Sequence, residues 1–342
     1  MARYPDDYRI DAITLILKNA DRGDSMGLVG IAGTGKSNLL RVLRDDFAYR
    51  KRVLGDRSDT LVVTSVNAII WEETPASLWE IMNDALLNAV ERHDIFLPSD
   101  NIRSLTDAEE RSRRRLGTNI NWLCRQNGYR LLFILDDFDY VIKQGPLSML
   151  DTLSAFRDDG NRDLLSYLVI TKQLPHIVGY QHQLDQRSKF YDLFSNRIYG
   201  LGPYNEHDAA QMLEHLNNNH GRPLSQVDRE YLLWLAGGHA RLIRVLFDAW
   251  SNSPPPLRER EALLQYFTDQ KDISQECCRV LKNLAFHEQR MIQSIYADKE
   301  IMLTLEQANH LKYRGLITNF SPLSWFSPVF AAHLERTKGE CP

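Results

Sequence analysis

The chain of 342 residues is long enough for two or three domains of ordinary size. With 43% hydrophobic and 25% charged residues, its composition is that of a globular protein and excludes disordered and collagen-like classes. Lys and Arg number 41 against 45 Asp and Glu, a net charge of -4. This balance gives no overall attraction for nucleic acid, so any such contact needs a local basic patch.

The cysteines and the apolar runs indicate the compartment. Cys124, Cys277, Cys278 and Cys341 share no spacing typical of a zinc site or a disulfide framework, so we expect reduced thiols. The longest apolar runs, such as residues 131–135, have the length of a strand, and the charged first residues lack the apolar core of a signal peptide. The sequence therefore predicts a cytoplasmic protein without a membrane segment.

The first two hundred residues alternate between short buried runs and helical patterns. A helix is expected before the first run, a second one begins near Lys36, and a long amphipathic helix covers 76–93. Strands that alternate with helices predict a parallel sheet with helices on its faces. The five expected strands are 26–31, 60–66, 130–135, 166–171 and 197–201.

After Gly202 and Pro203, the pattern becomes mainly helical. We assign 1–202 to the α/β domain, and three helical patterns predict a small helical lid over 203–252. Three consecutive prolines mark 253–273 as a linker. Residues 274–342 then follow the order of a winged helix: helices, a short strand and turn, and a last helix.

The most informative motif is GIAGTGKS, residues 30–37, with two glycines separated by four residues and followed by Lys and Ser. Between a strand and a helix, such a loop turns backbone N–H groups and a helix N-terminus toward a polyphosphate. Lys36 would reach the β and γ phosphates and Ser37 would bind Mg²⁺, so the motif predicts ATP or ADP with Mg²⁺; an ordinary glycine turn is the alternative. The loop residues expected at the nucleotide are Gly30, Ala32, Gly33, Thr34, Gly35, Lys36, Ser37 and Asn38.

Two acids follow the buried run 131–135, about a hundred residues downstream. We expect Asp136 to hold the magnesium ion through water and Asp137 to orient or deprotonate the attacking water. A solvated turn or a helix cap is the alternative role for such a pair.

These motifs, with a strand that ends at Thr171 and the later segments LGP and GGHAR, resemble those of P-loop ATPases of the AAA+ and STAND type. The resemblance extends from about Tyr8 to Leu334 and includes STAND signalling NTPases and archaeal-type origin-recognition ATPases. It implies a parallel five-stranded P-loop NTPase sheet of the ASCE type with helices on both faces, followed by a helical lid and a winged helix.

The resemblance also implies roles for single residues. Thr171, or Lys172 beside it, takes the place of sensor 1, and a polar residue that simply ends a strand is the alternative. Arg241 takes the place of sensor 2, an arginine that binds the γ phosphate from the lid, and a surface helix residue is the alternative there. Many hydrolysing relatives have Glu where this chain has Asp137, so we expect slow turnover. Arg197 is a candidate for an arginine finger that acts across a subunit boundary.

Three further residues are candidates for the site. Arg187 is a second candidate for the arginine finger, and an ordinary surface arginine is the alternative for both. Tyr8 and Arg9 precede the loop at the place where the related families hold the adenine.

Three functions are weighed. The first is a nucleotide-driven conformational switch of a signalling or defence system that acts with a protein partner or as a homo-oligomer. The alternative is a DNA-binding ATPase that resembles replication initiators or transposition regulators. The candidate DNA contacts are the cluster Arg111, Arg113, Arg114 and Arg115, which follows Glu109 and Glu110 and also fits a solvated helix face, and His310, Lys312 and Arg314 of the winged helix. A non-hydrolysing scaffold is a third possibility.

Overall fold

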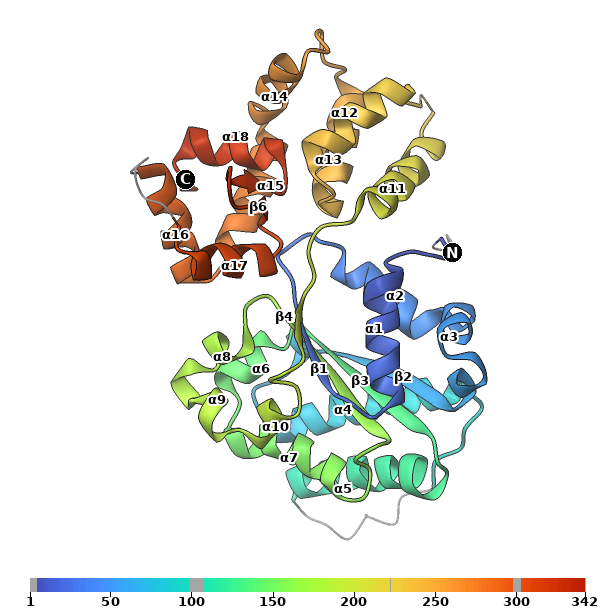
Figure 1. Ribbon diagram of the computed structural model, residues 1–342. Helices are drawn as coiled ribbons and strands as arrows, with labels where there is room; N and C mark the ends of the chain where they lie inside the picture. Colours follow the sequence, from blue (N-terminus) through green and yellow to red (C-terminus); the bar gives the residue numbers. More distant parts are fainter. Residues whose placement is uncertain (1–4, 99–106, 222, 298–302, 342) are drawn as a thin grey trace. The chain divides into compact units, whose positions relative to one another are not determined.

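The computed structural model describes residues 5–98, 107–221, 223–297 and 303–341. The chain forms two compact units (Figure 1). One contains 10–29 and 37–199, and the other contains 1–9, 30–36 and 200–342. The glycine-rich loop therefore belongs to the same unit as the C-terminal helices, although its neighbours in the sequence belong to the sheet.

The first unit is built on a five-stranded sheet in the order β2-β3-β4-β1-β5, and its pairs β2–β3, β3–β4 and β4–β1 are parallel. All five predicted strands are confirmed, although β1 ends two residues earlier than expected. Strands β3 and β4 are almost entirely buried, as expected for the centre of a parallel sheet. The strands are β1 (Met26–Val29), β2 (Leu61–Asn67), β3 (Arg130–Asp136), β4 (Leu165–Thr171) and β5 (Ile198–Gly200).

Helices cover both faces of this sheet. Successive side chains of a strand point to opposite faces, so alternate residues are buried against different helices. Leu131 and Phe133 join an apolar cluster with Trp79 of α4, whereas Leu132 and Ile134 are buried on the other face. The long helix α4 begins one residue before the predicted start, because Thr74 accepts a hydrogen bond from the first turn and proline follows it. The helices of this unit are α1 (Ile10–Asp21), α2 (Lys36–Asp45, from the end of the loop), α3 (Phe47–Leu54), α4 (Pro75–Glu91), α5 (Ala108–Asn121), α6 (Asp139–Gln144), α7 (Leu147–Asp158), α8 (Pro175–Val178), α9 (Leu184–Arg187) and α10 (Lys189–Asp192).

The second unit begins with the three helices predicted for the lid: α11 (Glu206–Asn218), α12 (Gln226–Ala236) and α13 (Ala240–Asn252). A further helix, α14 (Arg260–Thr268), lies within the stretch expected to be a linker. Its Phe267 is buried and stacks on Trp250 of α13 at 5.3 Å between ring centroids. The prolines are thus followed by a packed helix, because two apolar side chains four residues apart, Leu263 and Phe267, fill one face of it.

The C-terminal region has the element order of a winged helix. Three helices precede a two-stranded antiparallel sheet and a last helix. Trp325 and Phe330 pack edge to face at 5.8 Å in its small core. The elements are α15 (Lys271–Lys282), α16 (Phe286–Ala297), α17 (Leu305–Tyr313), β6 (Ile317–Asn319), β7 (Ser324–Trp325) and α18 (Pro328–Thr337).

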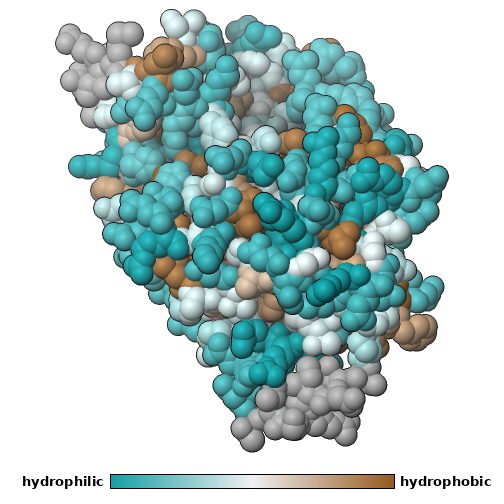
Figure 2. Space-filling model, turned by 60° about the horizontal axis from the view of Figure 1, so that its bottom comes forward, coloured by the Kyte–Doolittle hydropathy of each residue, from teal (hydrophilic) through white to brown (hydrophobic). Residues whose placement is uncertain are grey.

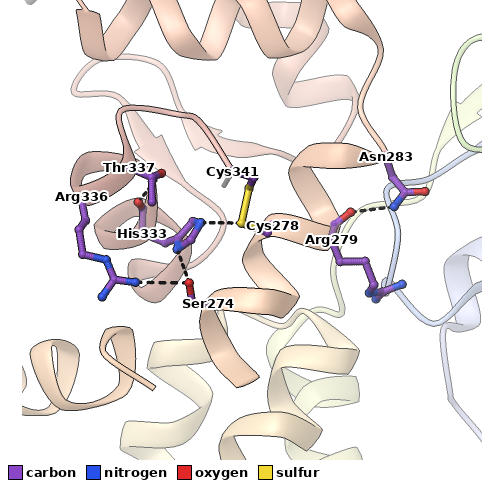
Figure 3. The surroundings of a disulfide bond; sticks show 8 residues. All are labelled: Ser274, Cys278, Arg279, Asn283, His333, Arg336, Thr337 and Cys341. Atoms are coloured by element: carbon purple, nitrogen blue, oxygen red, sulfur yellow. Dashed lines mark hydrogen bonds between the residues drawn. A yellow bond between two sulfur atoms is a disulfide. The ribbon is translucent and has the colours of Figure 1, made fainter. Parts of the chain in front are cut away.

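A disulfide bond joins Cys278 of α15 to Cys341, so the expectation of four reduced thiols was wrong for this pair (Figure 3). The two cysteines are 63 residues apart, and α18 returns the chain to α15, so local spacing gives no sign of the bond. Ring nitrogen Nε2 of His333 lies 3.5 Å from the sulfur of Cys278. Cys124 and Cys277 are free and buried, and burial raises the pKa of each thiol to about 12.

Hydrophilic residues predominate on the face drawn in Figure 2, where hydrophobic residues are scattered. Among the described residues, no helix combines the length and the apolar character that crossing a bilayer requires.

Candidate nucleotide-binding site

The loop Gly30–Lys36 connects β1 to α2 and needs glycine at two positions. Gly33 and Gly35 have φ of +88° and +90°, which side-chain-bearing residues rarely adopt. A Cβ on Gly35 would also come within 2.5 Å of the Tyr204 hydroxyl oxygen. The amino group of Lys36 donates to the carbonyls of Gly30 at 2.6 Å and Ile31 at 3.1 Å, which closes the loop into a tight turn.

Three consecutive carbonyl oxygens of the loop accept hydrogen bonds from other segments of the same unit. The oxygen of Ala32 is 2.8 Å from Nε2 of His239, and that of Gly33 accepts from the backbone N–H of Arg241 at 3.1 Å. The oxygen of Thr34 accepts from the guanidinium of Arg9 at 2.7 Å. The N-terminal segment and the start of lid helix α13 therefore fix the apex of the loop.

His239 is completely buried and neutral in this position. Its Nδ1 accepts from the backbone N–H of Leu242 at 3.2 Å and caps α13, so the proton lies on Nε2, which donates to Ala32. Burial lowers the pKa of His239 to about 4. His239 was not among the predicted site residues, although a polar residue after two glycines and before a helix is a typical N-cap signal.

We expect His239 to make the stability of the protein pH-dependent. Its folded-state pKa of about 4 lies below the ordinary value of 6.5, so protonation favours the unfolded chain. The stability from the neutral ring is complete above pH 6.5 and falls by up to about 3 kcal/mol as the pH drops toward 4. His239→Asn keeps a capping acceptor that does not titrate, so its melting temperature should fall less over this range. Parallel melting profiles for the two proteins would contradict the assignment; His333, whose burial lowers its pKa to about 4, contributes equally to both.

Glu276 of α15 is buried and binds two arginines beside the loop. Its carboxylate accepts from Nε of Arg241 at 3.1 Å and from two nitrogens of Arg279 at 2.8 and 2.5 Å. One Arg279 nitrogen would lie 2.7 Å from a Cβ on Gly33. The predicted sensor Arg241 is thus accompanied by Arg279, which no motif indicated because it comes from the distant helix α15.

The N-terminal segment expected at the adenine lies against the loop and the first residues after β5. Arg9 donates to the carbonyl of Gly202 at 3.0 Å as well as to Thr34, and its guanidinium lies 4.5 Å from the centre of the Tyr204 ring. The hydroxyls of Tyr8 and Tyr204 are 3.0 Å apart. The segment is thus fixed close to the loop, in accord with its predicted location, while its role toward adenine stays a prediction.

In the sheet unit, the predicted acids and sensor follow neighbouring strand ends. Asp136 is the last residue of β3, and Thr171 ends β4 in register with Val29, the residue before the loop. The Thr171 hydroxyl is buried and has no hydrogen-bond partner among the described residues. Asp137 has a φ of +51° and forms an ion pair with Lys172 at 2.8 Å.

Asp139 connects these two strand ends and was missed from the sequence. Its buried carboxylate accepts from the backbone N–H of Lys172 at 3.0 Å and from that of Gln173 at 3.3 Å. Burial raises the pKa of Asp139, and the backbone hydrogen bonds oppose the rise. The third acid of the run DDFD therefore positions the chain directly after Thr171.

The remaining candidates lie at the surface or in ion pairs. Ser37 and Asn38 are in the first turn of α2, where Ser37 is exposed. Arg197 pairs with Asp24 at 3.2 Å, and Arg187 is exposed at the end of α9. The cluster Arg111, Arg113, Arg114 and Arg115 is exposed on α5, where Arg114 pairs with Glu110 at 2.5 Å.

The winged helix offers less basic surface than its sequence indicates. Arg314 is buried, and its Nε donates to Glu288 at 2.7 Å. His310 contacts the same carboxylate at 2.8 Å. Burial would raise the pKa of Glu288, but these two partners lower it to about 2. Arg314 is therefore part of the core, and Lys312 is the exposed residue of the three proposed DNA contacts.

Comparison with known proteins identifies the fold. No family model and no curated protein match the chain. A Walker-type ATPase of Pyrococcus abyssi matches with 14% identity and a TM-score of 0.56 over 96% of this chain and 95% of that one. The ORC2 protein of Aeropyrum pernix in its ADP form matches with 13% identity and a TM-score of 0.51 over 99% and 96%. The ORC1 protein of Aeropyrum pernix in complex with DNA has 17% identity and a TM-score of 0.47 over 98% and 93%.

Proposed function

Because the chain has the fold of the AAA+ P-loop ATPases, we propose that it binds ATP with Mg²⁺ at Gly30–Ser37 and hydrolyses it slowly. The observation that carries the proposal is the glycine loop between β1 and α2. Its two left-handed glycines and the adjoining helix N-terminus form the cradle that phosphate binding requires.

The residues at the cradle and the strand ends fit a magnesium nucleotide. Ser37 and Asp136 provide a hydroxyl and a carboxylate, the oxygen ligands that Mg²⁺ prefers. Bound Mg²⁺ would supply positive charge to the phosphate oxygens. Lys36, which binds carbonyls within its own loop, has an ammonium group able to donate to the β and γ phosphates.

For hydrolysis, we assign Asp137 to the attacking water and Thr171 to the sensor. The buried Thr171 hydroxyl without a described partner supports the sensor role, since such a group is costly unless something binds it. Lys172 forms an ion pair with Asp137, so it competes with an attacking water for the carboxylate. Burial alone would lower the pKa of Lys172, but this ion pair raises it above its ordinary value. Slow turnover fits this pairing.

We propose that Arg241 couples the nucleotide bound at the loop to the positions of the lid and of α15. Its backbone binds Gly33 and its side chain binds Glu276, so it links the loop to both helices. We expect Arg241→Ala to bind ATP within about threefold of wild type, because the backbone contact that supports Gly33 does not depend on the side chain. Nucleotide-dependent protection of α15 from hydrogen exchange should be lost. Protection equal to that of wild type would exclude this role.

For the biological role, the likeness to an ORC2 protein over nearly the whole chain supports the DNA-handling alternative more than the signalling switch. The exposed cluster Arg111, Arg113, Arg114 and Arg115 would then contact DNA phosphates, with Lys312 as the exposed basic residue among the predicted winged-helix contacts. The burial of Arg314 leaves α17 poorly suited to read bases.

Phosphate release with Mg²⁺-ATP tests the function, measured with and without duplex DNA at low and moderate salt. We expect slow release that duplex DNA stimulates less as salt rises, because phosphate contacts displace counterions. A rate of phosphate release that DNA does not change would instead favour a conformational switch that acts with a protein partner. Stoichiometric nucleotide without any release would favour a scaffold.

A further inference from the structure

The first helix of the winged-helix region brings a second arginine to the glycine loop. The guanidinium of Arg279 lies so close to Gly33 that a methyl group there would meet it at 2.7 Å. Figure 3 shows that Arg279 and its neighbour Cys278 point in different directions from α15: the sulfur toward Cys341 and the guanidinium away from the disulfide. The orientation of Arg279 is therefore not set by the disulfide partner.

Glu276 fixes the position of the Arg279 guanidinium. It accepts from Nε and one terminal nitrogen of Arg279, a two-point contact that fixes the plane of the group. A guanidinium carries five N–H donors, so this contact leaves others for a ligand.

Beside the loop, two guanidinium groups bind the same carboxylate. Glu276 is shared between Arg241 and Arg279, and one carboxylate balances only one of two guanidinium groups. Arg279 and Lys36 both disfavour protonation of His239, which lies beside the same loop. An anionic ligand at Gly33 would complete the balance.

Resting on the proposed function, we propose that Arg279 is a nucleotide-binding residue that donates to the phosphate chain of the nucleotide in the Gly30–Ser37 loop. The winged-helix region then supplies a phosphate ligand of its own, separate from the lid arginine Arg241. The planar fork of an arginine suits phosphate oxygens, and the buried Glu276 preorganises it.

Binding of ATP, ADP and inorganic triphosphate to the full chain tests the proposal. Arg279→Ala should weaken all three roughly tenfold, the effect of losing one charge-assisted contact. Arg279→Lys should recover part of the loss, because it keeps the charge without the fork. Lys271→Ala is the matched control, because it removes an exposed cation from the start of α15, and it should bind like wild type.

The controls separate the possible failures. If Arg279→Ala binds all three probes like wild type while Lys36→Ala does not bind, Arg279 only pairs with Glu276 and the inference is overturned. If Lys36→Ala also binds normally, the proposed function itself fails. If Arg279→Ala melts well below wild type without nucleotide, Arg279→Lys serves as the test variant instead. Wild-type affinity for triphosphate in Arg279→Lys would then contradict a contact that needs the planar guanidinium.

Discussion

Lys36→Ala is expected to abolish nucleotide binding, with the dissociation constant for ATP raised roughly 100-fold or more. The variant loses the cation that would contact the β and γ phosphates at the centre of the cradle. It also loses the hydrogen bonds to Gly30 and Ile31 that close the loop. Calorimetric titration with Mg²⁺-ATP and Mg²⁺-ADP measures the effect directly.

The control for this experiment is Lys18→Ala, which removes an exposed lysine from α1 with the same change in net charge. It should bind ATP like wild type. Melting of the Lys36 variant without nucleotide should stay within a few degrees of wild type, because a partly exposed loop side chain contributes little to the fold. If the Lys36 variant binds ATP with wild-type affinity, the loop is not the nucleotide-binding segment.

Asp137→Asn should leave ATP binding intact and lower turnover by about 100-fold or more, the range for loss of a general base. Asparagine suits the position, since it tolerates the positive φ of 51° better than most residues. Loss of the ion pair to Lys172 costs under about 1 kcal/mol, because both side chains are partly exposed. Single-turnover phosphate release separates this loss from product dissociation.

Two further variants show whether the carboxylate itself is needed. Asp185→Asn changes an exposed acid on α9 and should release phosphate at the wild-type rate. Lys172→Met breaks the same ion pair but keeps Asp137, so it should retain turnover. If Lys172→Met is as inactive as Asp137→Asn, the effect comes from the ion pair or from Lys172 itself as the sensor, and not from the carboxylate.

Local signals predicted the strands, the glycine loop and the acids after β3, because each depends on a few adjacent residues. A run such as residues 131–135 is long and apolar enough to indicate a central strand by itself. The spacing of Gly30, Gly35 and Lys36 likewise indicates its backbone shape. For these features, sequence and structure agree closely.

The contacts around the loop depended on residues that are distant in the sequence. His239 and Arg279 meet the loop only after the C-terminal helices have packed, and neither belongs to the loop motif. The same holds for Arg314. The sequence predicts a surface residue that contacts DNA, but in the structure Arg314 is buried in an ion pair with Glu288. Long-range packing, rather than local propensity, decides such positions.

The disulfide also changes the unfolded chain. Joining Cys278 to Cys341 closes a loop of 63 residues, which in the chain-entropy model removes unfolded conformations worth about 4 kcal/mol. In thiol-reducing surroundings the unfolded C-terminal region regains that freedom, and its folded form becomes less favoured by the same amount. A reducing environment therefore lowers the stability of the region in which α15 holds Arg279 against the loop.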